Sequence, residues 1–528
     1  MLDDDAIRDR GIPKMILRNA RAVALALLAA VPLAIARPAA AAKSDDTLVV
    51  ALQRGITSVD YLYTTKREYI ILSQLTDDGL FDVNPVTLEV EPLAARSYKW
   101  VDDTTLDVTL REGIRFHDGS PFTADDVAYT YNYVIDPKSH ANRSRQFAEW
   151  LAGATKTGPL TVRFKLRYPY PLALRAMGGS MPLRKKGAYD DLAKTGGKAL
   201  GQTLNGIGPY RVVSVEPGRK TVIERFDGYY KDSPKGRPAI KRMVFREVPD
   251  WGTQQAELMS GGVQWTYDVP YDIAESLGST HQVTFVNGPS LRVGFIVLDA
   301  AGLTGKDNPL TRRDVRRAII HAINRPAIVK NIEKGDSQVI DSACHPAQFG
   351  CAQDVMKYPY DPARARELLK AAGYPNGFSF DLWAYREKDA AEAIAADLAK
   401  VGVTAKLRYV QLPTLDEARR KHEIPAYFGS WESGSIADTA AIAAVHWSDT
   451  TDRNMSGDKR VTEYMIGAQK TADAKKRAAL YEKGLKLIAE EAYWVPLYTF
   501  SLNYLVSNDL DFKPPKDGLP RLYLAKWK

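Results

Sequence analysis

Apolar residues recur along the chain with two different spacings. Residues 48–52 form a continuous apolar run, which predicts a buried strand. Leu106, Val108 and Leu110 alternate with polar residues, which is typical of a strand with one buried face. Other segments carry apolar residues at helical spacing, and the clearest set is Val315, Ala318, Ile319, Ala322 and Ile323. Strands and helices that alternate in this way predict an α/β protein.

The predicted strand at 106–110 leads into a turn and a capped helix. Asp118 and Gly119 supply the turn, because glycine adopts positive φ at no steric cost. Thr123 offers an N-cap, and Asp126 stands three residues later as an acidic variant of the capping box. We therefore expect a helix that begins directly after Thr123.

Further turn residues divide the middle of the chain. Residues 216–219 are expected to close a hairpin that spans 212–226. Gly261 and Gly262 are good residues to end the helix that precedes them. Residues 283–299 form a long β-rich stretch, which we expect to cross from one lobe of the protein to another.

The first 42 residues have the composition of an export signal. Basic residues precede an apolar stretch at 22–36, and small residues follow at 38–42, so we expect cleavage after Ala42. The apolar stretch is shorter than the ~20 residues of a spanning helix. A membrane anchor or a buried helix is the alternative interpretation. Met15 is an alternative start to Met1, because it would leave a signal of conventional sequence.

Composition and charge exclude several classes of protein. The chain has 528 residues, 45% of them hydrophobic and 26% charged, which is ordinary for a globular protein with more than one domain. The net charge of +8 is small for this length and no concentrated basic arm is present, so nucleic acid is not an expected partner. No cysteine lies near the expected cleavage point, which argues against a lipoprotein anchor and for a freely diffusing periplasmic protein.

The motifs of common enzymes are missing from the sequence. The seven histidines form no His-Glu-x-x-His pair, and no Gly-x-Ser-x-Gly segment occurs. Paired carboxylates such as Asp77 and Asp78 are adjacent, so they need not converge as a general acid and base. We therefore expect no catalytic residues, no cofactor and no metal site, and we do not expect an enzyme.

The two cysteines, Cys344 and Cys351, are seven residues apart. In an oxidising periplasm a disulfide is the expected state of such a pair. A metal site that uses both cysteines and His345 is the alternative, although no fourth ligand is evident.

Several separated motifs resemble one protein family. Residues 110–127 resemble the signature of the family 5 extracytoplasmic solute-binding proteins, which are the dipeptide, oligopeptide and nickel-chelate receptors of ABC importers. Residues 205–211 resemble the family's Gly-Thr-Gly-Pro-Tyr turn, with Ile207 in place of the threonine. A further match lies at 311–325, and the resemblance as a whole extends over residues 48–498 in the family's order.

The resemblance implies an α/β periplasmic-binding-protein fold of two lobes around a cleft, with a hinge between them. It also implies an extra subdomain in the larger, discontinuous lobe. We therefore expect a signal peptide at 1–42, lobe 1 with its insertion at 43–290, lobe 2 at 291–495, and a return to lobe 1 at 496–528.

One expected ligand segment lies at the end of a predicted strand. It resembles the stretch where peptide-binding relatives place an arginine and a tyrosine near the ligand carboxylate, and its side chains are Trp383, Tyr385 and Arg386. A guanidinium suits this role because it binds a carboxylate through two hydrogen bonds. An ordinary surface arginine is the alternative.

A second expected ligand segment contains Trp431, Glu432 and Asp438. Peptide receptors often carry Trp-x-x-Asp-Tyr here, and the aspartate holds the ammonium group of the ligand, whereas this chain has Gly434 three residues after Trp431. Glu432 or Asp438 is the expected substitute. Trp431 suits stacking on a flat or apolar ligand, with core packing as the alternative. Further candidates from the first lobe are Asp60, Tyr61 and Arg292.

These features together predict a periplasmic receptor of an ABC import system. It is expected to capture a short peptide or peptide-like solute as a monomer, and to deliver it to the transmembrane subunits of the permease. An oligosaccharide, an opine-like compound or a metal chelate is the alternative ligand. A secreted hydrolase or a periplasmic chaperone is the alternative function.

Overall fold

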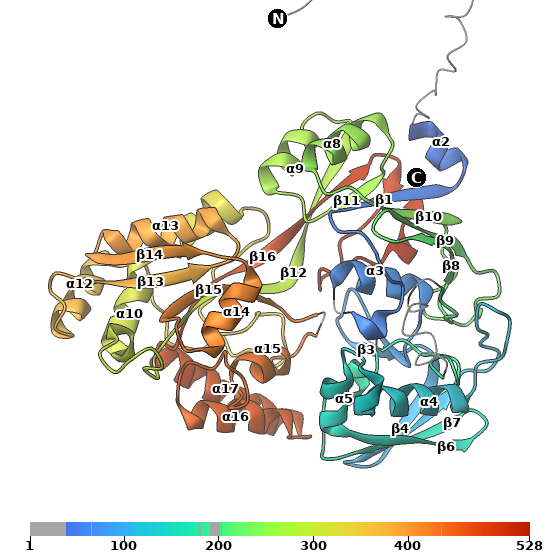
Figure 1. The fold of residues 1–528 in the computed structure, drawn as a ribbon, viewed down its shortest axis with the longest axis horizontal. Coiled ribbons are helices and arrows are strands. Elements are labelled where there is room, and N and C mark those ends of the chain that lie inside the picture. The colour runs from blue at the N-terminus through green and yellow to red at the C-terminus, as the bar shows by residue number, and fades with distance from the viewer. Residues whose placement is uncertain (1–38, 65, 179–180, 191–200, 202, 435) are drawn as a thin grey trace, which may run out of the picture.

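The computed structural model describes residues 39–64, 66–178, 181–190, 201, 203–434 and 436–528 (Figure 1). Most of the expected signal peptide, residues 1–38, lies outside the described residues. The expected cleavage point after Ala42 falls within the first described helix, α2 (Ala39–Ser44). No helix among the described residues is both long enough and apolar enough to cross a membrane.

A single sheet of ten strands runs through both lobes, in the order β14-β13-β15-β12-β16-β11-β1-β10-β9-β8 (Figure 1). Its strands in chain order are β1 (Thr47–Leu52), β8 (Tyr210–Glu216), β9 (Lys220–Arg225), β10 (Arg242–Glu247), β11 (Trp265–Tyr267), β12 (Val283–Leu298), β13 (Phe378–Ala384), β14 (Val403–Tyr409), β15 (Ala426–Glu432) and β16 (Trp494–Ser507). The lobes are therefore joined by hydrogen-bonded strands.

The long strands β12 and β16 make this junction. They pair antiparallel along their length, with register shifts between Pro289 and Val293 and between Gly294 and Phe295. In lobe 1, β16 also pairs with β11, and in lobe 2, β12 also pairs with β15. Register shifts of this kind bend strands and increase their twist, so they mark where the shared sheet passes between the lobes.

Alternating residues of β12 build two hydrophobic cores in lobe 2. Ile296 and Leu298 belong to the core under α10 (Arg313–Ala322), α12 (Pro362–Ala371) and α13 (Lys388–Ala399). Phe295 and Val297 belong to the core on the other face, under α14 (Leu412–Arg420), α15 (Ala440–His446), α16 (Lys459–Gln469) and α17 (Ala474–Glu490). Successive side chains of a strand point to opposite faces, and so the sheet is covered by helices on both sides.

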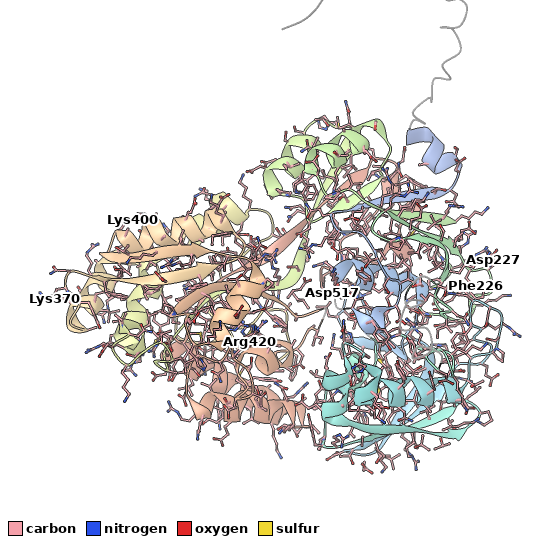
Figure 2. All side chains as sticks on the ribbon, in the orientation of Figure 1. Phe226, Asp227, Lys370, Lys400, Arg420 and Asp517 are labelled. Atoms are coloured by element: carbon pink, nitrogen blue, oxygen red, sulfur yellow. A yellow bond between two sulfur atoms is a disulfide. The ribbon has the colours of Figure 1, made fainter. Side chains whose placement is uncertain are left out.

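Lobe 1 is arranged around β1 in the same way. Leu48, Val50 and Leu52 pack in the core with α3 (Arg67–Thr76), while Ala51 packs on the other face with α8 (Trp251–Ser260) and α9 (Tyr271–Gly278). The C-terminal residues return to this lobe, where β17 (Leu510–Asp511) pairs with β18 (Lys526–Trp527). Figure 2 places Asp517 of this return on the side of lobe 1 that borders lobe 2.

An additional four-stranded sheet forms the subdomain of lobe 1. Its order is β4 (Ala95–Asp102), β5 (Thr105–Leu110), β7 (Thr161–Leu166) and β6 (Leu151–Gly158), and α4 (Ala124–Ile135) and α5 (Ser144–Trp150) pack with it. The hairpin of β2 (Phe81–Val83) and β3 (Val90–Pro92), with α6 (Ala173–Ala176), adjoins this core. Other helical segments are at 61–63, 137–139, 309–311, 325–328, 329–333 and 522–524.

The structure confirms most of the predicted local features. The Thr123 N–H donates to Asp126 Oδ2 (2.7 Å) at the start of α4, as expected for the capping box. Helix α8 ends at Gly261, whose φ is +74°. The cysteine pair forms the expected disulfide, with Cα atoms 5.8 Å apart, which excludes the alternative metal site at these cysteines.

Candidate functional site

Two cavities are lined by residues of both lobes. The larger has a volume of about 410 Å³ and is lined by Tyr61 and Trp150 of lobe 1 and by Trp431 and Ile436 of lobe 2, among others. The smaller has a volume of about 310 Å³ and is lined by residues of both lobes as well. Glu432 lines both cavities, so they adjoin at this residue.

Aromatic side chains form much of the lining of the larger cavity. Trp150 stacks on Tyr170 with ring centroids 4.8 Å apart, and both line the cavity. Tyr61 lines it too, with the Arg143 guanidinium 4.7 Å above its ring. Flat aromatic faces of this kind bind planar or apolar parts of a ligand.

Trp431 lies near the end of β15 and is supported from behind by His446. The two rings are 5.6 Å apart, and His446 also meets Phe295 (5.1 Å) and Trp494 (4.9 Å) edge to face. Burial lowers the pKa of His446 well below its usual value, so this histidine is neutral. The predicted stacking role of Trp431 is thus compatible with its position, because one part of the indole lines the cavity and another packs on the core.

Glu432 forms an ion pair that joins the lobes. Arg67, at the start of α3, donates through Nη1 to both carboxylate oxygens of Glu432, at 2.6 and 2.7 Å, and its Nη2 donates to the Gly518 carbonyl. Burial lowers the pKa of Arg67 and the Glu432 charge raises it, with a net upward shift. The Glu432 carboxylate is therefore already neutralised by a cation of the protein.

Asp438 is also occupied by a partner from the protein. It is buried and pairs with Arg477 of α17, Nη1 to Oδ2 at 2.9 Å. Burial raises the pKa of Asp438, and Arg477 offsets part of that rise. Neither carboxylate expected to replace the missing aspartate is free for a ligand ammonium.

The smaller cavity is lined by Arg386 of the first expected ligand segment and by Arg292, a separate candidate. Arg292 pairs with Glu387 (2.5 Å) and also donates to Ser430 Oγ. Arg386 is 43% exposed and pairs with the same Glu387 (2.9 Å), and Tyr385 lines the cavity beside it. The structure thus brings Tyr385, Arg386, Arg292 and Glu432 together around one cavity.

The side chains of three charged residues of the smaller cavity, Arg54, Glu68 and Asp268, form no hydrogen bond or ion pair with any described residue. Glu68 is only 7% exposed, and it makes no hydrogen bond or ion pair with any other described residue. Arg54 lines the same cavity, is exposed, and likewise pairs with no described residue. The unpaired carboxylates of Glu68 and Asp268 can accept hydrogen bonds from a cationic group of a ligand.

Several residues that line the larger cavity also carry buried polar atoms without a partner. Among the described residues that line it, buried N–H groups without an acceptor are Nε of Arg143 and Arg521, Nε1 of Trp150 and Trp431, and Nε2 of Gln469. The corresponding unpaired acceptor is Oε1 of Gln74. These atoms are not exposed to the cavity, so they do not determine which ligand it accepts.

Two expected ligand residues lie away from both cavities. Asp60 is buried, and its carboxylate pairs with Arg184 (3.1 Å) and accepts from Tyr189 Oη (2.7 Å). It also caps the short helix that begins at Tyr61. Trp383 is half-buried and packs with the lobe 2 core. Both residues are therefore in contact with other parts of the protein, and the Asp60 carboxylate is already engaged by protein donors.

The adjacent acids of lobe 1 diverge. Asp77 pairs with Arg184, whereas Asp78 pairs with Lys235 (2.6 Å). They cannot share a proton or a substrate as a catalytic pair would. No group of three or more metal-ligating side chains is found in the described part of the chain.

Sequence reasoning missed several residues that line the cavities. Arg67, Arg143, Arg175 and Arg521 come from four separate parts of lobe 1, and no local motif distinguishes them from surface arginines. The pair Tyr168 and Tyr170 preceded by Trp150 was a weak signal, since aromatic residues at a strand end often border a pocket.

The fold and the site define a two-lobe binding protein with a solute cavity at the lobe junction. The family description "Bacterial extracellular solute-binding proteins, family 5 Middle" matches residues 89–453, which is more than half of the chain. This protein belongs to that family.

Individual relatives agree with this assignment. The glutathione-binding protein GsiB of Escherichia coli (strain K12) is 28% identical over 498 residues, covering 90% of this chain and 94% of GsiB. DppA of Helicobacter pylori, solved with the peptide STSA, has the same fold, with a TM-score of 0.76 and 23% identity over 92% of this chain and 99% of DppA. AgaA of A. tumefaciens R10, solved with agropinic acid, has a TM-score of 0.73 and 20% identity over 91% of this chain and 99% of AgaA.

Proposed function

We propose that this protein is the periplasmic receptor of an ABC import system for a short peptide or peptide-like solute. The observation that carries the proposal is the pair of adjoining cavities lined by residues of both lobes. A solute held there contacts both lobes at once, so it binds the closed arrangement better than an open one. Closure by hinge motion then presents a distinct shape to the permease.

Recognition of the solute divides between the two cavities. In the smaller cavity, Arg386 and Arg54 suit a carboxylate, and Glu68 suits an ammonium group. In the larger cavity, the Trp150–Tyr170 stack and Trp431 suit a flat or apolar part of the solute. A short peptide with a free amino end meets all of these requirements.

An opine-like solute is the second candidate. Glu432 and Asp438 are both paired with arginines of the protein, so the expected ammonium site beside Trp431 is closed. A solute whose amine is substituted does not need that site. The agropinic acid complex of AgaA makes this class worth testing directly.

The remaining features of the proposal concern the whole chain. We propose a cleaved leader at 1–42, lobe 1 at 43–290 and 496–528, and lobe 2 at 291–495. The register shift beside Pro289 supports the first lobe boundary. A monomer that exchanges solute with the transmembrane permease subunits, without catalysis, is the functional unit.

Native mass spectrometry of the mature protein purified from a periplasm tests the proposal. A series of bound masses that match short peptides supports the peptide assignment. A single non-peptide mass moves the ligand to the opine-like class. Hydrolysis of chromogenic peptides by the same preparation contradicts the receptor proposal.

A further inference from the structure

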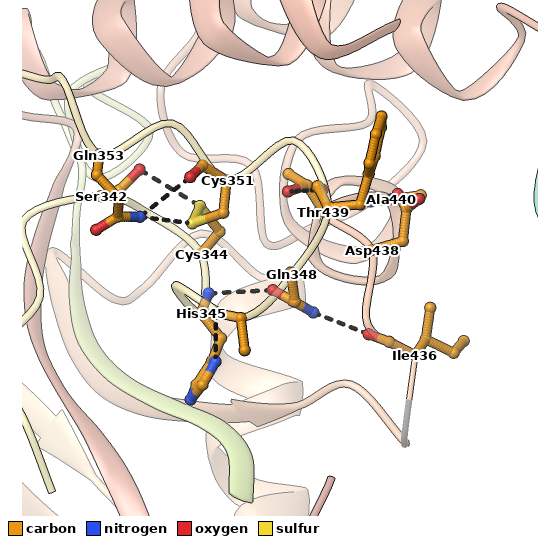
Figure 3. The surroundings of a disulfide bond; sticks show 12 residues. Ser342, Cys344, His345, Gln348, Cys351, Gln353, Ile436, Asp438, Thr439 and Ala440 are labelled. Carbon is orange, nitrogen blue, oxygen red and sulfur yellow. Dashed lines mark hydrogen bonds between the residues drawn. A yellow bond between two sulfur atoms is a disulfide. The ribbon is translucent and has the colours of Figure 1, made fainter. Parts of the chain in front are cut away.

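The loop closed by the disulfide lies against the lobe 2 wall of the larger cavity (Figure 3). This cleft wall is formed by residues 433–434 and 436–439, between β15 and α15, and Ser433, Gly434 and Ile436 line the cavity. The disulfide loop is residues 344–351, which are far from the wall in sequence. The contacts between the two segments are therefore tertiary and depend on both conformations.

Four hydrogen bonds tie the disulfide loop to the cleft wall. The Gln348 side-chain amide donates to the Ile436 carbonyl (3.0 Å), and the Phe349 N–H donates to the Ala437 carbonyl (3.0 Å). Thr439 donates to the Phe349 carbonyl through both its N–H (3.0 Å) and its hydroxyl (2.8 Å). The loop thus replaces the neighbouring strand that the wall lacks beyond the end of β15.

Gln348 is fixed before it reaches the wall. Its Oε1 accepts from the His345 N–H (3.0 Å), and its own N–H donates to the His345 carbonyl (2.9 Å), as Figure 3 shows for the side-chain contact. The side chain is 5% exposed. Both ends of this buried amide are in use, so its removal leaves Ile436 and His345 with unpaired groups.

A third contact connects the same two segments through α17. The Arg477 guanidinium lies 4.2 Å above the Phe349 ring and pairs with Asp438 of the wall (2.9 Å). The carboxylate that sequence reasoning assigned to the ligand is thus part of the support of the wall.

From these contacts we infer that Gln348 and Phe349 are positioning residues for the cleft wall, and that the protein binds its solute at full affinity only after the disulfide has formed. The affinity part of this inference rests on the proposed receptor function. The positioning of the wall by Gln348 and Phe349 does not. A disulfide restricts the conformations of the loop that it closes. Without that restriction, the loop no longer presents Gln348 and Phe349 to the wall in one geometry.

The functional consequence concerns the compartment of the protein. A dithiol reductant transfers two electrons and two protons to the Cys344–Cys351 bond, giving two thiols and the cyclic disulfide of the reductant. A reducing cytosol keeps such pairs as thiols. The same chain is then a weak binder before export and a strong binder after it.

Amide hydrogen exchange of the mature protein tests the positioning. We expect exchange at the Phe349 and Thr439 amides to become about tenfold faster in Gln348→Ala, in Cys344→Ala/Cys351→Ala, and in wild type with reduced dithiothreitol, because exchange follows local opening. The matched control is Gln353→Ala, which loses hydrogen bonds to the Cys351 carbonyl (3.1 Å) and Sγ (3.2 Å) but leaves the four hydrogen bonds to the wall in place. Amides of α10 serve as an internal reference, since a global loss of stability would accelerate them as well.

The inference is overturned if exchange at the wall is unchanged in Gln348→Ala and also in the two samples that lack the disulfide. For the affinity, S-methylglutathione is the probe, because it carries no free thiol to exchange with the disulfide. We expect its dissociation constant to rise about three- to tenfold in the reduced protein, with Gln353→Ala unchanged. Equal affinity of the oxidised and the reduced protein overturns the affinity part. Failure of the wild type to bind any peptide or opine counts against the proposed function. The exchange result then still decides the positioning.

Discussion

Glu68 is the residue whose role the surrounding protein explains least without a ligand, since it is buried in the smaller cavity and pairs with no described residue. We predict that Glu68→Gln weakens binding of S-methylglutathione about tenfold or more, because a hydrogen bond to a charged group contributes roughly 1.5–3 kcal/mol. Calorimetry with the N-acetyl derivative is the control. The derivative has no ammonium group, and wild type and variant should bind it equally.

Arg386 is predicted to hold the carboxylate of the solute. Arg386→Ala should weaken binding of anionic solutes more than it lowers stability, because the side chain is 43% exposed and its ion pair with Glu387 contributes little to folding. Arg408→Ala is the matched control, since Arg408 is an exposed arginine on the adjacent strand that pairs with Asp381 (3.0 Å). Equal affinity of wild type and Arg386→Ala in calorimetry would remove this residue from the site.

Glu333 links stability to pH close to the same arginines. Burial raises the pKa of Glu333 to about 7. The folded protein therefore keeps a proton that the unfolded chain has lost, and stability falls as pH rises from about 4.5 to 7. Thermal unfolding of Glu333→Gln should show a gain over wild type that grows between pH 5 and pH 8 by on the order of 1–2 kcal/mol. A gain that does not change with pH would contradict this assignment.

Among the elements, the turn before β8 shows why the family motif is rich in glycine. A Cβ on Gly208 would lie 2.4 Å from the backbone of Thr76 and Asp77 at the end of α3, and one on Gly206 would lie 2.1 Å from the Thr76 carbonyl. Glycine is needed here for close backbone approach. Gly208→Ala should therefore destabilise the protein by roughly 1–3 kcal/mol, the usual cost of overpacking. Gly467→Ala, where a Cβ meets nothing within 4 Å, is the control in the same unfolding experiment.

The elements themselves were largely predictable, because they depend on local patterns. The alternation at 106–110 gives β5, the capping residues Thr123 and Asp126 start α4, and the helical spacing at 315–323 gives α10. The ion-pair partners of the candidate site residues could not be predicted from the sequence. Glu432 is hundreds of residues from Arg67, and Asp438 is tens of residues from Arg477. Only the tertiary fold decides that each carboxylate meets an arginine. The partner of Asp60 was equally unpredictable, since Arg184 lies in a distant loop.

For the whole molecule, the Arg67–Glu432 pair connects the lobes without any solute. We predict that Arg67→Ala shifts the ligand-free protein toward a more open shape, because a charge-assisted hydrogen bond between the lobes contributes about 1.5–3 kcal/mol to the closed state. Small-angle X-ray scattering should show a larger radius of gyration. Arg67→Glu combined with Glu432→Arg should restore the compact shape, and a compact single variant would mean that other contacts hold the lobes together.

The shared sheet also governs the order in which the chain can fold. The strand β16, at 494–507, lies between β12 and β11. The sheet therefore lacks a central strand until nearly the whole chain has been made. Contacts between residues so distant in sequence form late and slowly. A growing chain consequently cannot complete its central sheet before residues 494–507 have been made. The topology thereby leaves the joining of β12 and β16 as a closing step for both lobes together.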